Sequence, residues 1–367
     1  MQGLQNDIAL QTLIDQVLTA NAAKTPLNIR GGGSKDFYGE TATGEVLDTR
    51  VLSGISSHQP SELVVTARCG TSLVELEAAL AEKGQCLPFE PPHFSAHSTV
   101  GGMVAAGLAG PSRAQAGSVR DYVLGVTLLN GQGEVMSFGG QVIKNVAGYD
   151  VSRLLAGSLG TLGVILEVSL KVLPIAPATA TLCFQMKEAD AIQQLNQWGG
   201  QPLPLSGSTW WNDTLVLRLS GAVAAVNAAV KKLGGEVVPE DEAVVFWRGV
   251  RDQTDAFFVT AQAAVSAGGE LWRVSMPQTA APLALAGESL IEWGGAQRWL
   301  VTATGQAASV RAAAKTAGGH ATLFRAAQKT SGAFTPLTEP LAQIHREMKR
   351  SFDPVGIFNP GRLYSGW

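Results

Sequence analysis

The spacing of apolar residues predicts alternating helices and strands in the first half of the chain. A first helix is expected behind the candidate N-caps Asn6 and Asp7, with six apolar residues on one face: Ile8, Leu10, Leu13, Ile14, Val17 and Leu18. A second helix should follow the Ser72–Glu75 capping box and stop at Gly84. Short apolar runs predict strands over residues 26–30 and 62–68.

Two further patterns predict a sheet in this half. Apolar runs over 122–129 and 134–138, separated by Asn130-Gly131, are typical of a β-hairpin. Residues 164–172 alternate, with valines and leucines on one face and Glu167, Ser169 and Lys171 on the other, which predicts a strand with one covered face. Prolines at 174 and 177 then favour a domain boundary, so we expect a first domain over residues 1–175.

The second half contains an internal repeat. Residues 220–235 (SGAVAAVNAAVKKLGG) align with residues 304–319 (TGQAASVRAAAKTAGG), and eight of the sixteen positions are identical. Each copy is predicted to be a helix between two strands. The sequence therefore predicts a second domain, residues 176–340, with an antiparallel or mixed sheet and helices on one face. The remaining residues, 341–367, carry Asp-Pro and Asn-Pro-Gly turns and are expected to be ordered.

Composition and charge narrow the class of protein. With 46% hydrophobic and 16% charged residues, the chain is expected to be globular. The net charge of −3 provides no basic field for nucleic acid. Cys69, Cys86 and Cys183 are too widely spaced for an iron–sulfur site or a disulfide framework. No signal peptide or membrane span is indicated, so we expect a cytoplasmic protein that reaches the inner face of the membrane only peripherally, through partners.

Three glycine-rich segments are candidate ligand-binding surfaces. They are RGGGSK at 30–35, the region 91–118 around STVGG, and residues 144–165, where small residues interrupt a core-like run. Glycine lets a phosphorylated ligand approach the main chain, and successive N–H groups form anion-binding nests. None of the three matches the Rossmann or P-loop pattern. A tight structural turn is the alternative interpretation of each segment taken alone.

Together these segments resemble a known family. RGGGS, STVGGMVAAGLAGP with GSVRDYVLGV, KNVAGYD with GSLGTLGVI, and the closing FDPVGIFNPGRL resemble FAD-binding proteins of the vanillyl-alcohol-oxidase and p-cresol-methylhydroxylase (PCMH) type. The resemblance covers about residues 25–175 and 345–364. It implies an α+β protein, with a two-subdomain PCMH-type FAD-binding domain (1–175), an α/β cap domain (176–340) and a C-terminal segment (341–367) that returns to the FAD domain. Within this family, the second and third blocks are similar to the E-type FAD-binding subunits of bacterial glycolate oxidase.

The resemblance also implies a cofactor site. The residues expected around FAD are Gly31, Gly32, Gly33 and Ser34 at the pyrophosphate; Ser98, Thr99, Gly101 and Gly102 at the pyrophosphate and ring; Gly117, Ser118 and Asp121 along the ribityl chain; Gly157, Gly160, Thr161, Gly163, Val164 and Ile165 at the flavin and adenine half; and Asn359 near the ring. Some members tether FAD through a histidine beside the first loop. Here Ser34 and Lys35 occupy that place, so we expect a non-covalent FAD.

One departure from the family bears on catalysis. Members that oxidise 2-hydroxy acids by themselves carry a His-x-Gly-Asp-Gly-Asn-x-His run and a later Glu-His-Gly, which supply metal ligands and the proton acceptor. This chain has neither, and only His93 and His97 lie close together, in a loop-like stretch, so no metal is expected. Oxidation of a 2-hydroxy acid needs a base and a cation. The candidates are Arg113, Lys144, Arg298, Arg325 and His345, and each can equally be structural, so the catalytic residues stay unassigned.

The resemblance implies a function within a complex. We expect an FAD-dependent 2-hydroxy-acid oxidoreductase subunit of a glycolate oxidase that converts glycolate to glyoxylate. A sister FAD subunit would carry the metal motif, and an iron–sulfur subunit would receive the electrons, because this chain lacks cysteines for clusters. Two alternatives stay open: a stand-alone FAD-dependent dehydrogenase of another small 2-hydroxy acid, and a non-catalytic scaffold with a flavin-binding fold.

Overall fold

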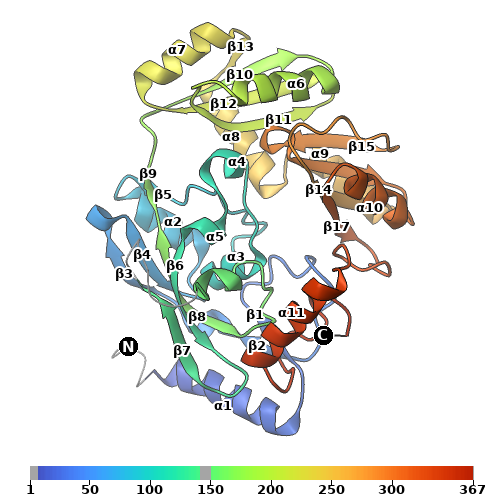
Figure 1. Ribbon diagram of the computed structural model, residues 1–367. Coiled ribbons are helices and arrows are strands. Elements are labelled where there is room, and N and C mark those ends of the chain that lie inside the picture. Colours follow the sequence, from blue (N-terminus) through green and yellow to red (C-terminus); the bar gives the residue numbers. More distant parts are fainter. Residues whose placement is uncertain (1–6, 141–149, 367) are drawn as a thin grey trace.

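The computed structural model describes residues 7–140 and 150–366. Its N-terminal region, residues 7–174, centres on a five-stranded antiparallel sheet in the order β3-β4-β8-β6-β7 (Figure 1). The strands are β3 (Ile55–Gln59), β4 (Val64–Arg68), β8 (Val164–Lys171), β6 (Val123–Leu129) and β7 (Val135–Gly139). The predicted hairpin is confirmed, because β6 and β7 pair from Leu129↔Val135 to Gly125↔Gly139.

Strand β8 departs from its prediction. It lies between β4 and β6, and both of its faces are largely buried. Ile165 is buried on the face that was expected to be open, and the Ser169 hydroxyl bonds to the Thr66 hydroxyl at 2.8 Å. The expectation of one covered face was therefore wrong, since a central strand with polar groups paired internally can be covered on both sides.

The helices of this region begin where their capping residues predict. Helix α1 (Ile8–Ala23) starts at Asp7, whose carboxylate accepts hydrogen bonds from the N–H groups of Ala9 and Leu10. Its buried face consists of Leu10, Leu13, Val17 and Ala20. Ile8 and Leu18 are exposed, so they were wrongly assigned to that face. Helix α2 (Leu73–Ala81) starts at Ser72, and α3 (Val100–Ala106) starts at Thr99.

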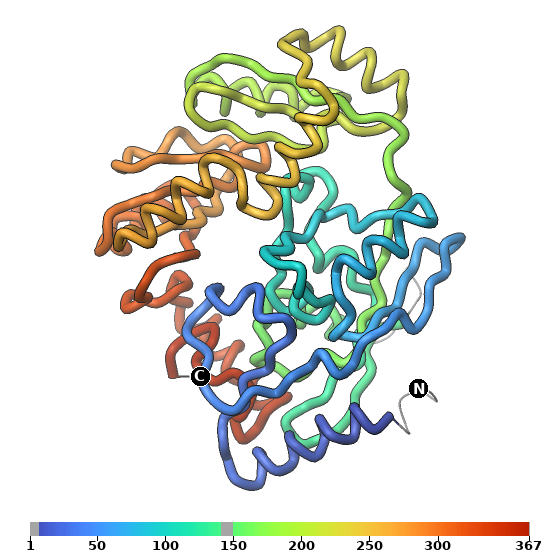
Figure 2. Tube along the Cα trace, turned by 180° about the vertical axis from the view of Figure 1, so that it is seen from behind, coloured from blue at the N-terminus to red at the C-terminus, as the bar shows by residue number. Residues whose placement is uncertain are grey.

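Shorter elements complete the N-terminal region. Strand β1 (Leu27–Arg30) pairs in parallel with β2 (Glu45–Asp48), and β5 (Gln85–Cys86) pairs with β9 (Leu173–Pro174). Two four-residue helices, α4 (Arg113–Ala116) and α5 (Val119–Tyr122), precede β6. Helix α11 (Glu339–Phe352) and the chain after it return to β1, where Leu27 N–H donates to the carbonyl of Ile357 at 2.7 Å. Figure 2 shows this red C-terminal segment beside the blue chain that follows α1.

Residues 178–326 form one eight-stranded antiparallel sheet in the order β13-β10-β12-β11-β15-β16-β14-β17. Its strands are β10 (Ala178–Gln185), β11 (Leu205–Trp211), β12 (Thr214–Gly221), β13 (Glu236–Val238), β14 (Glu270–Ser275), β15 (Glu288–Glu292), β16 (Gln297–Thr302) and β17 (His320–Ala326). The strand order of the second half, outward from β15, corresponds to that of the first half, outward from β11. The predicted strand–helix–strand copies are confirmed as β12–α7–β13 and β16–α10–β17.

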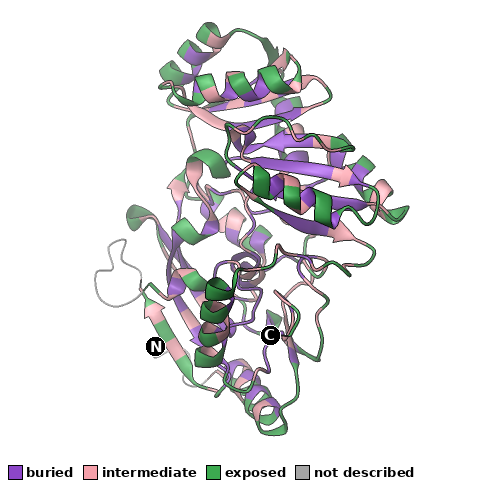
Figure 3. Ribbon diagram, turned by 45° about the vertical axis from the view of Figure 1, so that its right-hand side comes forward, coloured by how far each residue is buried: buried purple, intermediate pink, exposed green. Residues whose placement is uncertain are grey.

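Helices cover both faces of this sheet, whereas the sequence predicted helices on one face. Its helices are α6 (Glu188–Gly199), α7 (Val223–Leu233), α8 (Glu240–Asp252), α9 (Ala256–Ser266) and α10 (Ala307–Thr316). The first two and α10 pack on one face. On the other face, Trp247 of α8 bonds to Thr181 at 3.0 Å, and α9 packs against Leu271 and Trp299. The strands between these layers are largely buried (Figure 3).

A hydrophobic cluster joins the two regions. Tyr38 and Leu159 of the N-terminal region share it with Phe257, Trp299 and Phe324 of the eight-stranded sheet. This cluster holds the face of the sheet that carries Trp299 and Phe324 close to the loop that follows β1. Within the described ranges, no helix is both long and apolar enough to cross a membrane.

Candidate cofactor site

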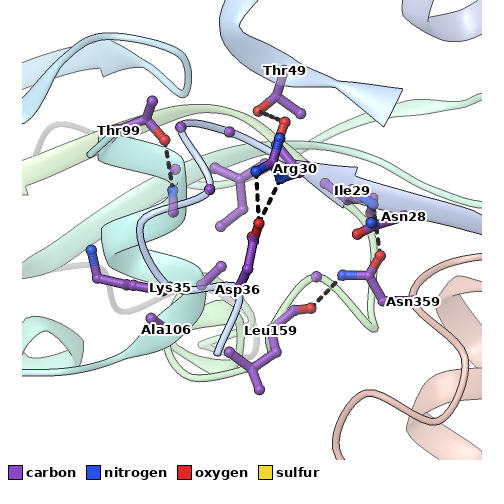
Figure 4. Close-up of a pocket in the computed structure, with 18 of the residues that line it drawn as sticks. Asn28, Ile29, Arg30, Lys35, Asp36, Thr49, Thr99, Ala106, Leu159 and Asn359 are labelled. Atoms are coloured by element: carbon purple, nitrogen blue, oxygen red, sulfur yellow. Dashed lines mark hydrogen bonds and ion pairs between the residues drawn. The ribbon is translucent and has the colours of Figure 1, made fainter. Parts of the chain in front are cut away.

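The three glycine-rich segments and the C-terminal chain line one cavity, of about 790 Å³ including the space open to solvent (Figure 4). Eleven of the eighteen residues predicted at the cofactor lie in its wall: Gly31, Gly32, Gly33, Ser34, Thr99, Gly101, Gly102, Gly160, Gly163, Ile165 and Asn359. They come from the end of β1, the start of α3, the entry to β8 and the tail. Segments that are far apart in sequence therefore converge on one cavity.

Close packing of the first two segments explains their glycines. A Cβ atom on Gly31 would lie 2.4 Å from Thr99 Oγ1, and one on Gly32 would lie 1.5 Å from the carbonyl oxygen of His97. Thr99 in turn caps α3, where its hydroxyl accepts the Gly102 N–H at 3.3 Å. Only glycine allows the loop after β1 to lie directly on the start of α3, and main-chain groups then form much of the cavity wall.

The third segment is held by the tail. Gly160 has a φ of +74°, and a Cβ there would lie 2.7 Å from Asn359 Nδ2. The Asn359 side chain accepts the Ile29 N–H at 2.7 Å and donates to the Leu159 carbonyl at 2.6 Å, as Figure 4 shows. The ammonium group of Lys349 donates to the carbonyls of Thr161 and Phe358, both at 2.7 Å. The tail thus closes one side of the cavity.

Seven predicted residues lie outside this cavity wall: Ser98, Gly117, Ser118, Asp121, Gly157, Thr161 and Val164. Ser98 is buried directly beneath the wall, with its hydroxyl 2.7 Å from that of Ser34. The Asp121 carboxylate caps α5 by accepting the Ser118 N–H at 2.7 Å, and Gly117 precedes that turn. The other three residues lie elsewhere. Val164 of β8 is part of the hydrophobic core, and Gly157 and Thr161 line a second cavity, between residues 154–162 and the tail. The start of the third segment, including Lys144 and Gly148, lies outside the described residues.

Sequence reasoning missed two cations at the cavity. Lys35 lines it, and its ammonium group lies 3.3 Å from the Ser34 hydroxyl and 5.5 Å from the centre of the Phe94 ring. Burial lowers the pKa of Lys35 to about 8, and the charge of Asp252 opposes this shift. Arg362 donates to the carbonyl oxygens of Asp36 (3.0 Å) and Lys35 (3.3 Å). Its position in the Asn-Pro-Gly-Arg turn was the available signal.

These features fit FAD, whose diphosphate is anionic. Seven glycines line the cavity and offer main-chain N–H groups there, and the wall also contains a cation that burial leaves without full solvation. Asp36, an acid in the wall, is paired with Arg30 at 2.7 Å. The wall therefore leaves Lys35 available to an anionic ligand. A histidine at the tethering position is absent, because Ser34 and Lys35 stand there.

The structure separates the candidate catalytic groups. Arg298 is buried and donates to the carbonyls of Ala280 and Ala281, so its role is structural. Arg113 stacks on Trp293 at 5.0 Å, and His345 lines the second cavity. Arg325 lies 3.4 Å from the centre of the Phe37 ring, beside the cofactor cavity. His93, one of the pair weighed as metal ligands, lies 3.1 Å from the Glu77 carboxylate.

Comparison with known proteins identifies the family. Residues 10–139 match the family model described as an FAD binding domain. Glycolate oxidase subunit GlcE of Escherichia coli is 48% identical over 355 residues, which cover 97% of each chain. Glycolate oxidase subunit GlcD of Bacillus subtilis is 31% identical over 184 residues, 49% of this chain and 39% of that protein. A D-lactate dehydrogenase of Archaeoglobus fulgidus is 34% identical over 158 residues, 42% of this chain and 35% of that protein.

A solved structure of alkyldihydroxyacetonephosphate synthase superposes with a TM-score of 0.65 at 14% identity, covering 95% of this chain and 74% of that one. At this identity the likeness concerns the fold alone, and it extends over both sheets. The expected α+β fold with an FAD-binding domain is confirmed. The chain is an FAD-binding protein that belongs to the family of the glycolate oxidase subunit GlcE.

Proposed function

We propose that this chain is the FAD-binding subunit of a glycolate oxidase complex and holds FAD non-covalently in the glycine-lined cavity. The single observation that supports this most is the convergence of three glycine-rich segments and the tail on one cavity that also contains Lys35. The complex and its substrate are inferred from membership of the GlcE family, because a glycolate oxidase converts glycolate to glyoxylate. When bound, FAD supplies two-electron acceptance from a substrate and onward transfer of single electrons.

The residues of this chain have defined tasks in the proposal. The main chain at Gly31–Ser34 and the start of α3 would bind the diphosphate, with Lys35 as its counter-charge. Asn359 would hold β1 and the Leu159 turn at a fixed separation. The hydrophobic cluster around Tyr38 and Phe324 would keep water from one side of the cavity. All of these tasks are binding and positioning.

Domain organisation and partners complete the proposal. Residues 1–175 act as the FAD-binding domain, residues 176–340 as a cap, and residues 341–367 as a segment that returns to the first. The Leu27–Ile357 hydrogen bond supports the return. We further propose a sister FAD subunit with the metal motif, an iron–sulfur subunit as electron acceptor, and a cytoplasmic complex that meets the membrane only through partners. Cys69 lies in the turn after β4, Cys86 in β5 and Cys183 in β10, and this separation supports a cluster-bearing partner.

The absorbance of the purified full chain tests the proposal. We expect flavin bands that survive addition of glycolate under anaerobic conditions and bleach only after the partner subunits are added. Acid precipitation should release the yellow colour into the supernatant, because the FAD is not tethered. Failure to take up FAD would refute the proposal.

A stand-alone dehydrogenase of another small 2-hydroxy acid is the second candidate, because D-lactate dehydrogenases match part of this chain. Bleaching of the isolated chain by D-lactate, without partners, would favour it. If the flavin bands of this chain persist with every substrate, even in the assembled complex, the non-catalytic scaffold would be favoured.

A further inference from the structure

A third cavity adjoins the cofactor cavity. It lies between the loop over residues 36–42 and the eight-stranded region, where α9 and residues 325–329 form its other wall, and it measures about 1210 Å³ including the space open to solvent. The two cavities share Asn28, Asp36 and Ala42 as lining residues. A ligand in this third cavity would therefore lie next to the proposed FAD.

Arg325, at the end of β17, forms no ion pair with any acid in the part of the chain that the structure describes, although Asp36 and Glu40 line the same cavity. Its guanidinium carbon lies 3.4 Å from the centre of the Phe37 ring, and its Nε atom is buried without a hydrogen-bond acceptor among the described residues. Burial lowers the pKa of Arg325 to about 10, with no nearby acid opposing the shift. A largely desolvated cation that has aromatic rings but no anion beside it is costly to a folded protein. Such a group on a cavity wall indicates an anionic ligand.

The neighbouring charges strengthen this argument. Lys329 donates to the carbonyls of Phe37 (2.6 Å) and Gly39 (2.9 Å), and burial lowers its pKa to about 8, with Arg362 and Arg325 adding to the shift and the charge of Glu40 opposing it. The acids of this wall have other partners. Asp36 pairs with Arg30, and Glu40 accepts the Ala333 N–H. Two adjacent cations thus face the cavity, and a bound anion would relieve their repulsion.

We propose that the third cavity binds a small carboxylate and that Arg325 is its anchor. A guanidinium group is planar, and an aromatic ring against one face fixes the orientation of its nitrogen atoms, which can then match the two coplanar oxygens of a carboxylate. Gln262 and Ser266 of α9 line the opposite wall and offer further hydrogen bonds. The inference rests on the proposed function in one respect, since it takes this carboxylate to be that of a 2-hydroxy acid or its oxidised product.

Calorimetric titration of the full, FAD-loaded chain with oxalate tests this site. Oxalate is a small dicarboxylate that the flavin cannot oxidise as a 2-hydroxy acid. We expect Arg325→Met to weaken oxalate binding by about tenfold or more, and Arg325→Lys to weaken it less, because lysine keeps the charge and loses the planar fork. Arg248→Met, on the exposed side of α8, removes the same charge elsewhere and should leave the affinity within about twofold.

Separate readouts keep the two proposals apart. Flavin absorbance and the thermal unfolding midpoint are measured for every variant, to report FAD uptake and folding. If Arg325→Met does not fold, the oxalate affinity of Arg325→Lys tests the carboxylate site instead. Equal oxalate affinity in the wild type and the Arg325 variants would overturn the site, as would a wild-type chain that does not bind oxalate or that binds phosphate more tightly. If the chain takes up no FAD, the proposed function fails, while the same titration of the FAD-free chain still tests the carboxylate site.

Discussion

The side-chain amide of Asn359 donates a hydrogen bond to the carbonyl of Leu159 at 2.6 Å, across 200 residues of sequence. The same side chain accepts the N–H of Ile29 in β1, so one residue joins the first strand, the third glycine-rich segment and the tail. Asn359 has a φ of 42°, a left-handed conformation that asparagine tolerates better than most residues. The shape of the cofactor cavity therefore depends on a side chain near the C-terminus.

Replacement of Asn359 by alanine should weaken FAD binding. The change leaves a buried N–H and a buried carbonyl unsatisfied, which costs about 1–3 kcal/mol, so the Kd for FAD should rise on the order of tenfold. Fluorescence titration of the FAD-free chain measures this Kd. Asn196→Ala, on α6 in the other region, is the matched control and should bind FAD as the wild type does. An unchanged Kd in Asn359→Ala would show that the tail does not shape the site.

Replacement of Gly32 by alanine should disrupt the loop after β1. The new methyl group would lie 1.5 Å from the carbonyl oxygen of His97, so the loop must separate from the start of α3. We expect loss of FAD uptake, measured by absorbance after gel filtration, with far-UV circular dichroism reporting the fold. Gly199→Ala, at the end of α6, adds a methyl group that meets nothing within 4 Å and should retain FAD. Full retention of FAD by Gly32→Ala would contradict the close packing of the first two segments.

Binding of FAD should weaken as the pH rises through about 8. Lys35 has a pKa of about 8 because it is buried, so it is charged below that pH and loses its attraction for the diphosphate above it. Between about pH 7 and about pH 9 the Kd should rise several-fold in the wild type, since hydrogen bonds to charged groups contribute about 1.5–3 kcal/mol. Lys35→Met should bind more weakly at pH 7 and show a flatter profile. Lys232→Met, exposed on α7, should follow the wild type. A parallel dependence in Lys35→Met would assign the titration to another group.

Replacement of Glu292 by glutamine should stabilise the protein at neutral and higher pH. Burial raises the pKa of Glu292 to about 7, although hydrogen bonds from Trp299 (2.6 Å) and Gln297 (3.0 Å) oppose the shift. The folded state thus binds more protons than the unfolded state between the ordinary carboxyl pKa and about 7, and stability falls as the pH rises through that window. Glu292→Gln lacks this loss and should be more stable by on the order of 1–3 kcal/mol at about pH 8.

Urea unfolding at several pH values measures the effect of Glu292→Gln. Its advantage should shrink toward acid pH, where the wild-type carboxyl is protonated. Glu288→Gln, exposed on the same strand, is the control and should change little at any pH. An advantage that is independent of pH would rule out titration of Glu292 as its cause.

Local pattern accounts for much of what was predicted. Asp7 and Ser72 cap the starts of α1 and α2, and the turn that begins with Asn130-Gly131 connects β6 to β7. These features were predictable because capping and turn formation depend on residues within a few positions of one another. The repeat at 220–235 and 304–319 predicted two strand–helix–strand units for the same reason. Predictions about faces were weaker. Ile8 and Leu18 match the helical period and are exposed, and β8 is covered on both sides.

The sequence by itself determined the glycine-rich segments, their order and the family to which they belong. Tertiary structure decided which of those residues share a wall. Thr99 lines the cavity and Ser98 lies beneath it, although they are adjacent, because neighbouring side chains at the start of α3 point in different directions. The charged residues show the same difference between what sequence and tertiary structure determine. Lys35 and Lys329 were not among the expected site residues, and Arg325 was one of five candidate groups that the sequence did not distinguish. They become distinctive only when folding removes much of their water and places them among rings and carbonyls. Solvation is a property of the whole packed structure, so no local pattern of residues can specify it.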